Sequence, residues 1–200
     1  MKKLFVLFLL SGICLYSFSQ TKMINGDFSA LKGQKSVNIK FDYSNVAVGK
    51  FKNEQDYITT KVADYNKKEP GRGDTWKTAW FNDRPTRFEP KFLELVNKYL
   101  DKAGLVVSQD SKDAEYTMTV RVIFIEPGFN VYVTRKPAMI DTEIDLTKNS
   151  EPTKILGTLG AKNMPGNSFG GNDYDTGQRI SESFAKCGKE VGAFLSKKVL

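Results

Sequence analysis

The sequence predicts an α+β domain, in which two main helices, at about 90–103 and 177–197, pack on one face of a mostly antiparallel sheet of four to six strands. The strongest indication lies at 116–125, where apolar side chains alternate with mostly polar ones, as in a half-buried strand. Both helical segments carry apolar residues three or four positions apart, which is typical of a helix with one buried face. The expected order along the chain is β-α-α-β-β-β-β-β-α.

The first 19 residues are expected to form a secretory signal peptide and to take no part in the fold. Lys2 and Lys3 precede an apolar run at 4–10, which is shorter than the roughly 20 residues that span a bilayer. Cleavage is predicted after Ser19. Lipid attachment at Cys14 is the less favoured alternative, because a large residue precedes that cysteine. The protein is therefore expected in the periplasm or outside the cell, without a transmembrane span in its mature chain.

Charge and cysteine content narrow the class of protein further. The chain has 30 basic and 23 acidic residues, and loss of the leader leaves 28 basic residues and a net charge of +5. Because no block of five or more like charges occurs, we expect no nucleic-acid partner. Cys187 has no second cysteine in the mature chain and lies on an apolar helix stripe, so it is expected to be a core residue. The polar segment 20–35 is expected to be a flexible arm before a single domain at 36–200.

Capping residues predict where the helices begin and end. Asn53 is a suitable N-cap for a short helix that ends before Pro70. Pro90 at a first helical position indicates the start of the next helix, with a capping box from Thr86 as the alternative. The last helix can be capped by Asp175. Its Gly188 and Gly192, one turn apart, would let it approach the sheet closely.

The strands follow from alternating patterns between turn residues. A proline and a glycine after 116–125 end that strand, and the short links beyond it predict an antiparallel meander. A glycine- and asparagine-rich stretch at 163–177 is expected to be a long loop. The expected strands are 37–43, 105–108, 116–125, 131–134, 140–146 and 154–161.

Catalytic and metal-binding patterns are weak. The chain has no histidine, the commonest general base and metal ligand, so we expect no enzyme activity, metal or cofactor. Asp141, Glu143 and Asp145 point to one side of a predicted strand. Glycoside hydrolysis requires two carboxyl groups that flank the scissile bond, one of them with a raised pKa. This row is therefore expected to face solvent, and a carboxylate-based hydrolase is the least favoured alternative.

The segment 71–88 concentrates aromatic and basic residues. Trp76 and Trp80 are four positions apart, so a helical turn would place both on one face beside Arg84. Exposed, they could stack on sugar rings or acyl chains, with arginine pairing a phosphate or carboxylate. Burial in a second small core is the favoured alternative. With the 163–174 loop, the candidate ligand-binding residues are Trp76, Trp80, Phe81, Arg84, Arg87, Asn167, Phe169 and Tyr174.

The passage from Phe92 to Phe124 joins an amphipathic helix, a short strand and Ala114-Glu115-Tyr116 at the start of a long strand. It resembles small cell-envelope α/β domains, such as the amino-terminal domain of the Tol-system propeller protein and outer-membrane assembly lipoproteins. The resemblance implies a non-enzymatic envelope role with a protein or lipid partner, and the aromatic segment adds a glycan to the possible partners. The protein is expected to be a monomer or weak oligomer. The alternative is a carbohydrate- or lipid-binding module built on the 76–84 cluster.

Overall fold

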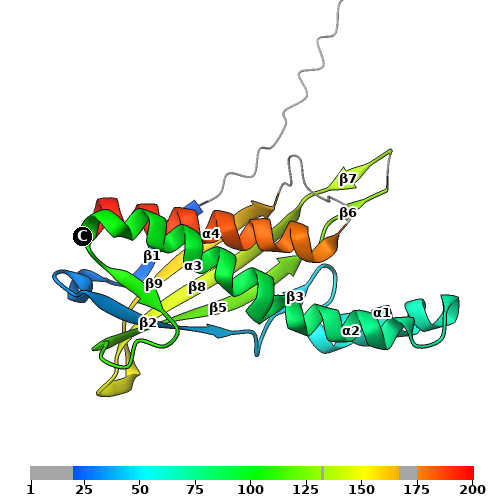
Figure 1. Ribbon diagram of the computed structural model, residues 1–200, viewed down its shortest axis with the longest axis horizontal. Helices are drawn as coiled ribbons and strands as arrows, with labels where there is room; N and C mark the ends of the chain where they lie inside the picture. The colour runs from blue at the N-terminus through cyan, green and yellow to red at the C-terminus, as the bar shows by residue number, and fades with distance from the viewer. Residues whose placement is uncertain (1–19, 132, 167–174) are drawn as a thin grey trace, which may run out of the picture.

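The computed structural model describes residues 20–131, 133–166 and 175–200, so the predicted signal peptide lies outside the described residues. The protein has an α+β fold, as predicted. Helices α3 (Glu89–Leu100) and α4 (Thr176–Lys198) lie side by side over one face of a twisted sheet (Figure 1). None of the helices in the described part of the chain is long and apolar enough to cross a membrane.

The sheet is mixed and has seven strands, more than the four to six predicted. Its order is β1-β9-β8-β5-β2-β4, and β3 also pairs with β5. β2 is parallel to β4 and β5, and β3 is parallel to β5, because three helices separate β3 from β4 and such a crossover can return the chain in the same direction. Only the β1-β9-β8-β5 part is antiparallel. The strands are β1 Gln20–Gly26, β2 Ser36–Asp42, β3 Ala47–Val48, β4 Val106–Ser108, β5 Tyr116–Glu126, β8 Ala138–Lys148 and β9 Glu151–Gly166.

Strand β5 lies in the middle of the sheet and supplies part of the core. Met118, Val120 and Val122 are buried, as the alternation predicts. The pairing of β5 with β8 then shifts register between Val122 and Phe124. Beyond this irregularity Ile125 is buried in place of Phe124, because one extra residue in a strand reverses the faces of those that follow.

The segment expected to be a flexible arm is part of the sheet, so that prediction is wrong. β1 forms an antiparallel edge strand on β9. The chain then turns through a short 3-10 helix, η1 (Ser29–Leu31), and Phe28 and Leu31 are fully buried. Gly157 on β9 allows this close approach, since a Cβ there would lie 2.3 Å from the carbonyl oxygen of Asp27.

The segment 71–88, to which the sequence assigned no element, is helical. α1 (Glu54–Lys68), capped by Asn53 as predicted, and α2 (Arg72–Asp83) form an antiparallel hairpin that projects from one end of the sheet (Figure 1). Gly71 makes the turn between them with a positive φ of 83°. Gly73 brings the two helices together, because a Cβ there would lie 2.4 Å from the carbonyl oxygen of Val62.

A π-helical segment, η2 (Arg84–Phe88), joins α2 to α3 in one continuous helical path. The backbone N–H of Glu89 donates to the carbonyl of Arg84, five residues earlier. Pro90 has no N–H and cannot continue the ordinary ladder, and a π turn is one way to absorb such a break. Pro90 therefore follows an irregular turn within the helical path, whereas the sequence predicted that it starts a separate helix.

The prediction of a return strand at 131–134 is also wrong. β6 (Phe129–Asn130) and β7 (Arg135–Lys136) form a separate two-stranded ribbon that projects beyond β5 and β8 (Figure 1). Gly128 makes the turn into it with a positive φ of 63°. A Cβ there would lie 2.3 Å from the carbonyl oxygen of Lys136, so the turn brings the two strands of the ribbon together.

Gly188 and Gly192 allow α4 to approach helix α3 closely. The prediction that they let it approach the sheet is wrong. A Cβ on Gly188 would lie 2.3 Å from the carbonyl oxygen of Phe92. A Cβ on Gly192 would lie 2.8 Å from that of Val96. The two helices therefore pack almost backbone to backbone, and this pairing supports the base of the α1–α2 hairpin through η2.

Candidate functional site

Two residues of the predicted ligand site form an internal anchor. The indole N–H of Trp80 donates to the Glu54 carboxylate at 2.7 Å, and the Arg84 guanidinium donates to both oxygens of the same group at 2.5 Å. The side chains of Arg84 and Glu54 are 18% and 14% exposed, and Trp80 is buried. Both donors are thus used inside the chain, where they hold α1 against the α2–η2 junction.

Phe81 and Arg87 also have partners within the protein. The Arg84 guanidinium lies 4.9 Å from the centre of the Phe81 ring, which remains partly exposed. Arg87 pairs with Asp83 at 3.3 Å and with Asp175 at 2.9 Å. Arg87 therefore ties η2 to the N-terminus of α4, where Asp175 also accepts from the backbone N–H groups of Gly177 and Gln178.

Asp175→Asn is expected to destabilise the protein at neutral pH and to have a smaller effect at acidic pH. Burial raises the pKa of Asp175, but hydrogen bonds from Arg87 and the helix N-terminus outweigh it and hold the pKa below its ordinary value. The stabilisation is therefore present above the unfolded-state pKa of about 3.9 and is lost as pH falls through the folded-state pKa. We expect a loss of up to about 1 kcal/mol at pH 7, since asparagine still caps but cannot pair with Arg87. Urea unfolding at pH 7 and pH 3.5 measures it. A difference that does not shrink at the lower pH would contradict this assignment.

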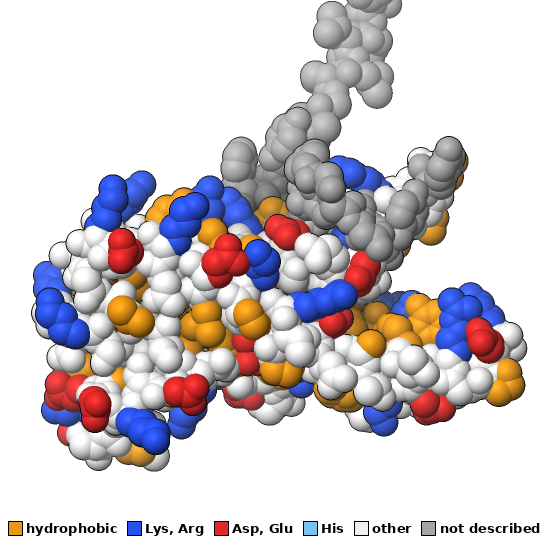
Figure 2. Space-filling model, viewed as in Figure 1, with side chains coloured by type: hydrophobic (Ala, Val, Ile, Leu, Met, Phe, Trp, Pro, Cys, Tyr) orange, Lys and Arg blue, Asp and Glu red, His pale blue; other side chains and the backbone are white. Residues whose placement is uncertain are grey.

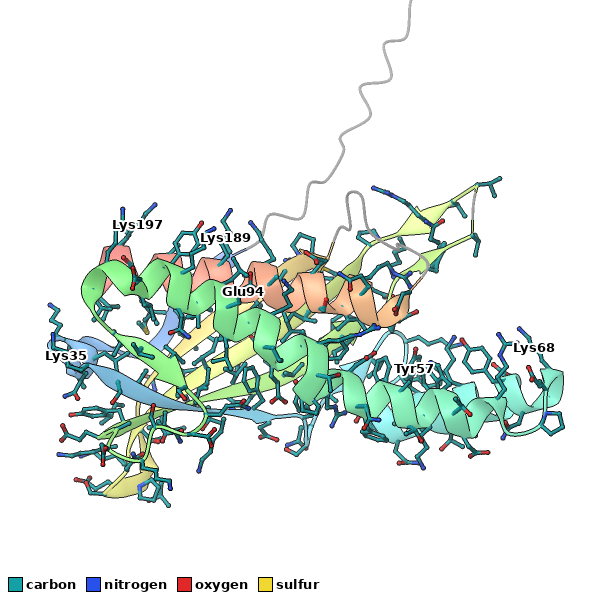
Figure 3. All side chains as sticks on the ribbon, in the orientation of Figure 1. Lys35, Tyr57, Lys68, Glu94, Lys189 and Lys197 are labelled. Carbon is teal, nitrogen blue, oxygen red and sulfur yellow. The ribbon has the colours of Figure 1, made fainter. Side chains whose placement is uncertain are left out.

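An aromatic pocket of about 320 Å³ lies where the hairpin meets the body of the protein. Figure 2 shows hydrophobic side chains gathered on the hairpin beside lysine and arginine side chains. Figure 3 places Tyr57 near the base of α1 and Lys68 at its far end. The side chains from this region that line the pocket belong to Val48, Lys50, Phe51, Tyr57, Thr60, Lys61, Asp64, Tyr65, Trp76, Glu126, Pro127 and Thr176.

The aromatic rings of this pocket form a continuous strip. The ring centres of Phe51 and Tyr57, of Tyr57 and Trp76, and of Trp76 and Tyr65 are each 5.7 Å apart. Trp80 lies beneath them, 5.6 Å from Trp76. Trp76 is half-buried, so of the two predicted tryptophans it is the one that lines the pocket. Burial raises the pKa of Tyr57.

Three cations of the chain lie over this strip. The Lys61 ammonium is 5.8 Å from the ring centres of both Tyr57 and Tyr65. Lys50 lies 5.5 Å from Phe51, and Arg72 lies 5.5 Å from Tyr65. Such contacts contribute about 0.5–1 kcal/mol at exposed sites, so a better partner can draw the lysines away from the rings.

The acids near the pocket are partly neutralised. Glu126 pairs with Lys136 at 2.6 Å and accepts from the backbone N–H of Gly128 at 3.0 Å. Asp64 is exposed and is the remaining acidic group in the lining. The lining carries two basic groups, Lys50 and Lys61, and two acidic groups, Asp64 and Glu126, so it has no net charge by itself. Because Lys136 pairs with Glu126 from outside the lining, the local balance is slightly positive.

A larger hollow of about 610 Å³ lies between β1 and α4. Its lining is dominated by the long side chains of Lys22, Glu190, Lys197 and Lys198, and Phe194 is the aromatic residue among them. Flexible charged chains on a shallow surface hold no fixed arrangement of contacts. The aromatic pocket beside the hairpin is therefore the better candidate site.

The carboxylate row of β8 is engaged across the sheet, and Asp145 is buried, so the expectation that the row faces solvent is wrong for this residue. Arg121 on β5 donates to Asp145 and to Glu143, each at 2.7 Å. Asp145 also accepts from Thr158, and Asp141 accepts from the backbone N–H of Asn163. These are cross-strand contacts within one sheet, and among the described residues no group of three or more histidine, cysteine, aspartate or glutamate side chains could hold a metal ion.

The predicted loop residues Asn167, Phe169 and Tyr174 lie outside the described residues. Sequence reasoning missed the other half of the pocket, which α1 and the segment before it supply. Tyr57, Lys61 and Tyr65 repeat every four positions, and this spacing on a predicted helix indicates one face. The partner of that face on α2 could not be recognised while 71–88 had no assigned element.

No family model and no curated protein matches the chain. Similar solved structures include a PelC variant from Paraburkholderia phytofirmans, described as a dodecamer, with a TM-score of 0.37, 11% identity and coverage of 86% of this chain and 99% of that one. A second PelC dodecamer structure from the same organism has a TM-score of 0.36, 10% identity and coverage of 86% and 98%. A DUF330 protein from Xanthomonas campestris has a TM-score of 0.33, 9% identity and coverage of 80% and 84%. Similarity at this level assigns neither a family nor a function to the chain.

Proposed function

We propose that the chain is an exported, non-enzymatic protein of the cell envelope that binds a partner through the aromatic pocket. Export is supported by residues 1–19, in which basic residues come first, an apolar run follows, and small and polar residues come last. The observation that carries the binding role is the strip of Phe51, Tyr57, Trp76 and Tyr65 beside a projecting helical hairpin. Concave sites lined by aromatic side chains and a few polar groups are where proteins most often hold ligands.

The partner can be an envelope protein, a glycan or a lipid. A carbohydrate- or lipid-binding module is the second candidate function, and the aromatic strip favours it over a purely structural role. Its contacts differ from those that the sequence predicted, because Arg84 and Trp80 are engaged with Glu54 while Lys61 and Tyr65 line the pocket.

Two measurements on the tagged full chain test this proposal. Mass spectrometry of the envelope fraction is expected to find a chain that begins at Gln20. A photoreactive residue at Thr60, which lines the pocket, is expected to crosslink an envelope component. The matched control is the same residue at Thr59, which is also exposed but does not line the pocket.

A chain that keeps its leader and remains in the cytoplasm would overturn the export part. Equal crosslinking from positions 59 and 60 would overturn the binding site. Turnover of a glycoside that Glu143→Gln abolishes would overturn the non-enzymatic part, because the proposal assigns Glu143 no role beyond its ion pair with Arg121.

A further inference from the structure

We infer that the aromatic pocket binds an anionic glycan, with sugar rings against Trp76 and Tyr65 and acidic substituents paired with Lys50 and Lys61. This inference rests on the proposed function and names the ligand class of the same site. Three other hollows on the described surface lack an aromatic platform of this kind, and a fourth, around Glu69–Arg72, shares Trp76 with it.

The aromatic strip offers successive ring surfaces, tilted by 65°, 71° and 50° to one another, to an extended ligand built from rings. Each step from Phe51 to Tyr57, Trp76 and Tyr65 is 5.7 Å between ring centres. Trp76 also lines the neighbouring hollow at the hairpin turn, so the platform continues along the hairpin beyond the pocket. Flat aromatic side chains offer large contact areas with little loss of conformational freedom, and the C–H faces of sugar rings can lie against them.

The ammonium groups of Lys50 and Lys61 favour acidic groups on that ligand. Lys61 lies between Tyr57 and Tyr65, and Lys50 lies over Phe51, so both ammonium groups stand at the surface on which a ligand would lie. Neither lysine has a carboxylate partner among the ion pairs of the described residues. A carboxylate or phosphate bound there would replace weak ring contacts with charge-assisted hydrogen bonds.

The polar part of the lining favours a glycan over an acyl chain. Asp64 is exposed and can accept from sugar hydroxyl groups. The Thr60 hydroxyl also lines the pocket and donates to the carbonyl of Asp56, so it can still accept from a ligand. About half of the lining is polar or charged. An acyl chain would cover the Asp64 carboxylate without giving it a hydrogen bond, whereas a sugar, which carries donors and acceptors around its ring, can donate to it.

The test is a titration of the purified protein, followed by intrinsic tryptophan fluorescence and calorimetry. The probes are hexagalacturonate, maltohexaose, phosphatidylglycerol vesicles, and phosphatidylglycerol vesicles that contain lipopolysaccharide. We expect hexagalacturonate to bind and maltohexaose to bind at least fivefold more weakly. The Lys50→Gln/Lys61→Gln variant is expected to weaken hexagalacturonate binding about tenfold, because each exposed ion pair contributes up to about fivefold in affinity.

Lys35→Gln is the matched control, since Lys35 is an exposed lysine at the end of the protein opposite the hairpin (Figure 3). It is expected to leave binding unchanged. Trp76→Phe keeps an aromatic ring in the strip and is expected to retain binding, whereas Trp76→Ala is expected to weaken it at least fivefold. Circular dichroism of each variant identifies any loss of folding. The lysine variants change surface side chains and are expected to fold, so they test the inference even if Trp76→Ala does not fold.

If the protein bound only the vesicles that contain lipopolysaccharide, and the lysine variants bound them more weakly, the inference would stand and a glycolipid would be the source of the sugar. Equal binding of maltohexaose and hexagalacturonate would overturn it, as would binding of phosphatidylglycerol vesicles alone. No binding of any probe, with crosslinking from position 60 intact, would overturn the glycan and leave the proposed function standing.

Discussion

Gly188→Val is expected to lower the free energy of unfolding by about 3 kcal/mol, at the upper end of the cost of overpacking a core. The Cβ of any residue at 188 would lie 2.3 Å from the carbonyl oxygen of Phe92 on α3. That neighbour is backbone, so it cannot rotate away as a side chain could. The two helices must separate, and α3 and α4 together cover the sheet (Figure 1). Urea unfolding followed by circular dichroism measures the loss.

Ala185→Val is the matched control on the same helix, because Ala185 is only half-buried beside a surface hollow. It carries the helix-propensity cost of a β-branched residue, below about 1 kcal/mol, without the clash. Gly192→Ala, where the nearest atom is 2.8 Å away, is expected to fall between the two. A loss at Gly188 no larger than that of the control would show that the helices are not packed backbone to backbone.

Elements with a strong local pattern could be predicted from the sequence. The alternation around Val120, the N-cap at Asn53 and the apolar stripe of α4 each depend on neighbours within a few positions. Whether a strand is parallel is not set by such neighbours. β2 and β5 are parallel, and the intervening helices permit this pairing but do not determine it. One of those helices, α2, carries too weak an apolar stripe to be recognised.

The edge strand β1 shows a second limit of local patterns. Its residues are mostly polar, and most of those whose side chains are described are exposed, because one side of the strand faces solvent; Met23 packs against the core. The pairing partner, β9, lies more than 100 residues later in the chain. A composition typical of an arm therefore belongs to a strand whose hydrogen bonds come from a distant segment.

The candidate site could be predicted only in part for the same reason. Trp76 and Trp80 share one face of α2, and both were reasonable ligand contacts from their spacing. Glu54 on α1 decides between them, because it accepts from the indole of Trp80 and leaves Trp76 at the pocket. The position of that carboxylate follows from the hairpin, and the hairpin from a turn at Gly71 whose φ is positive.

Glu54→Ala is expected to lower the free energy of unfolding by about 2–3 kcal/mol, somewhat less than the 3–5 kcal/mol typical of a fully buried ion pair that loses one partner. The change leaves the Arg84 guanidinium, 18% exposed, without its carboxylate and the Trp80 indole without its acceptor. Both groups lie where α1 crosses the α2–η2 junction. The hairpin is therefore expected to loosen with the loss of stability, and a change in near-ultraviolet circular dichroism from the tryptophans should accompany it.

Two comparisons separate the parts of this effect. Glu54→Gln can still accept from Trp80 but carries no charge for Arg84, so it is expected to retain part of the lost stability. Glu69→Ala removes an exposed partner of Arg72 on the same hairpin, where the Glu69 side chain is 69% exposed and that of Arg72 is 54% exposed. This change is expected to lower the free energy of unfolding by less than about 1 kcal/mol. If Glu54→Ala cost no more than Glu69→Ala, the anchor would be an ordinary surface contact. The hairpin, and with it the aromatic pocket, would then depend on ring packing and on contacts such as the hydrogen bond from the Gly73 N–H to Asn66.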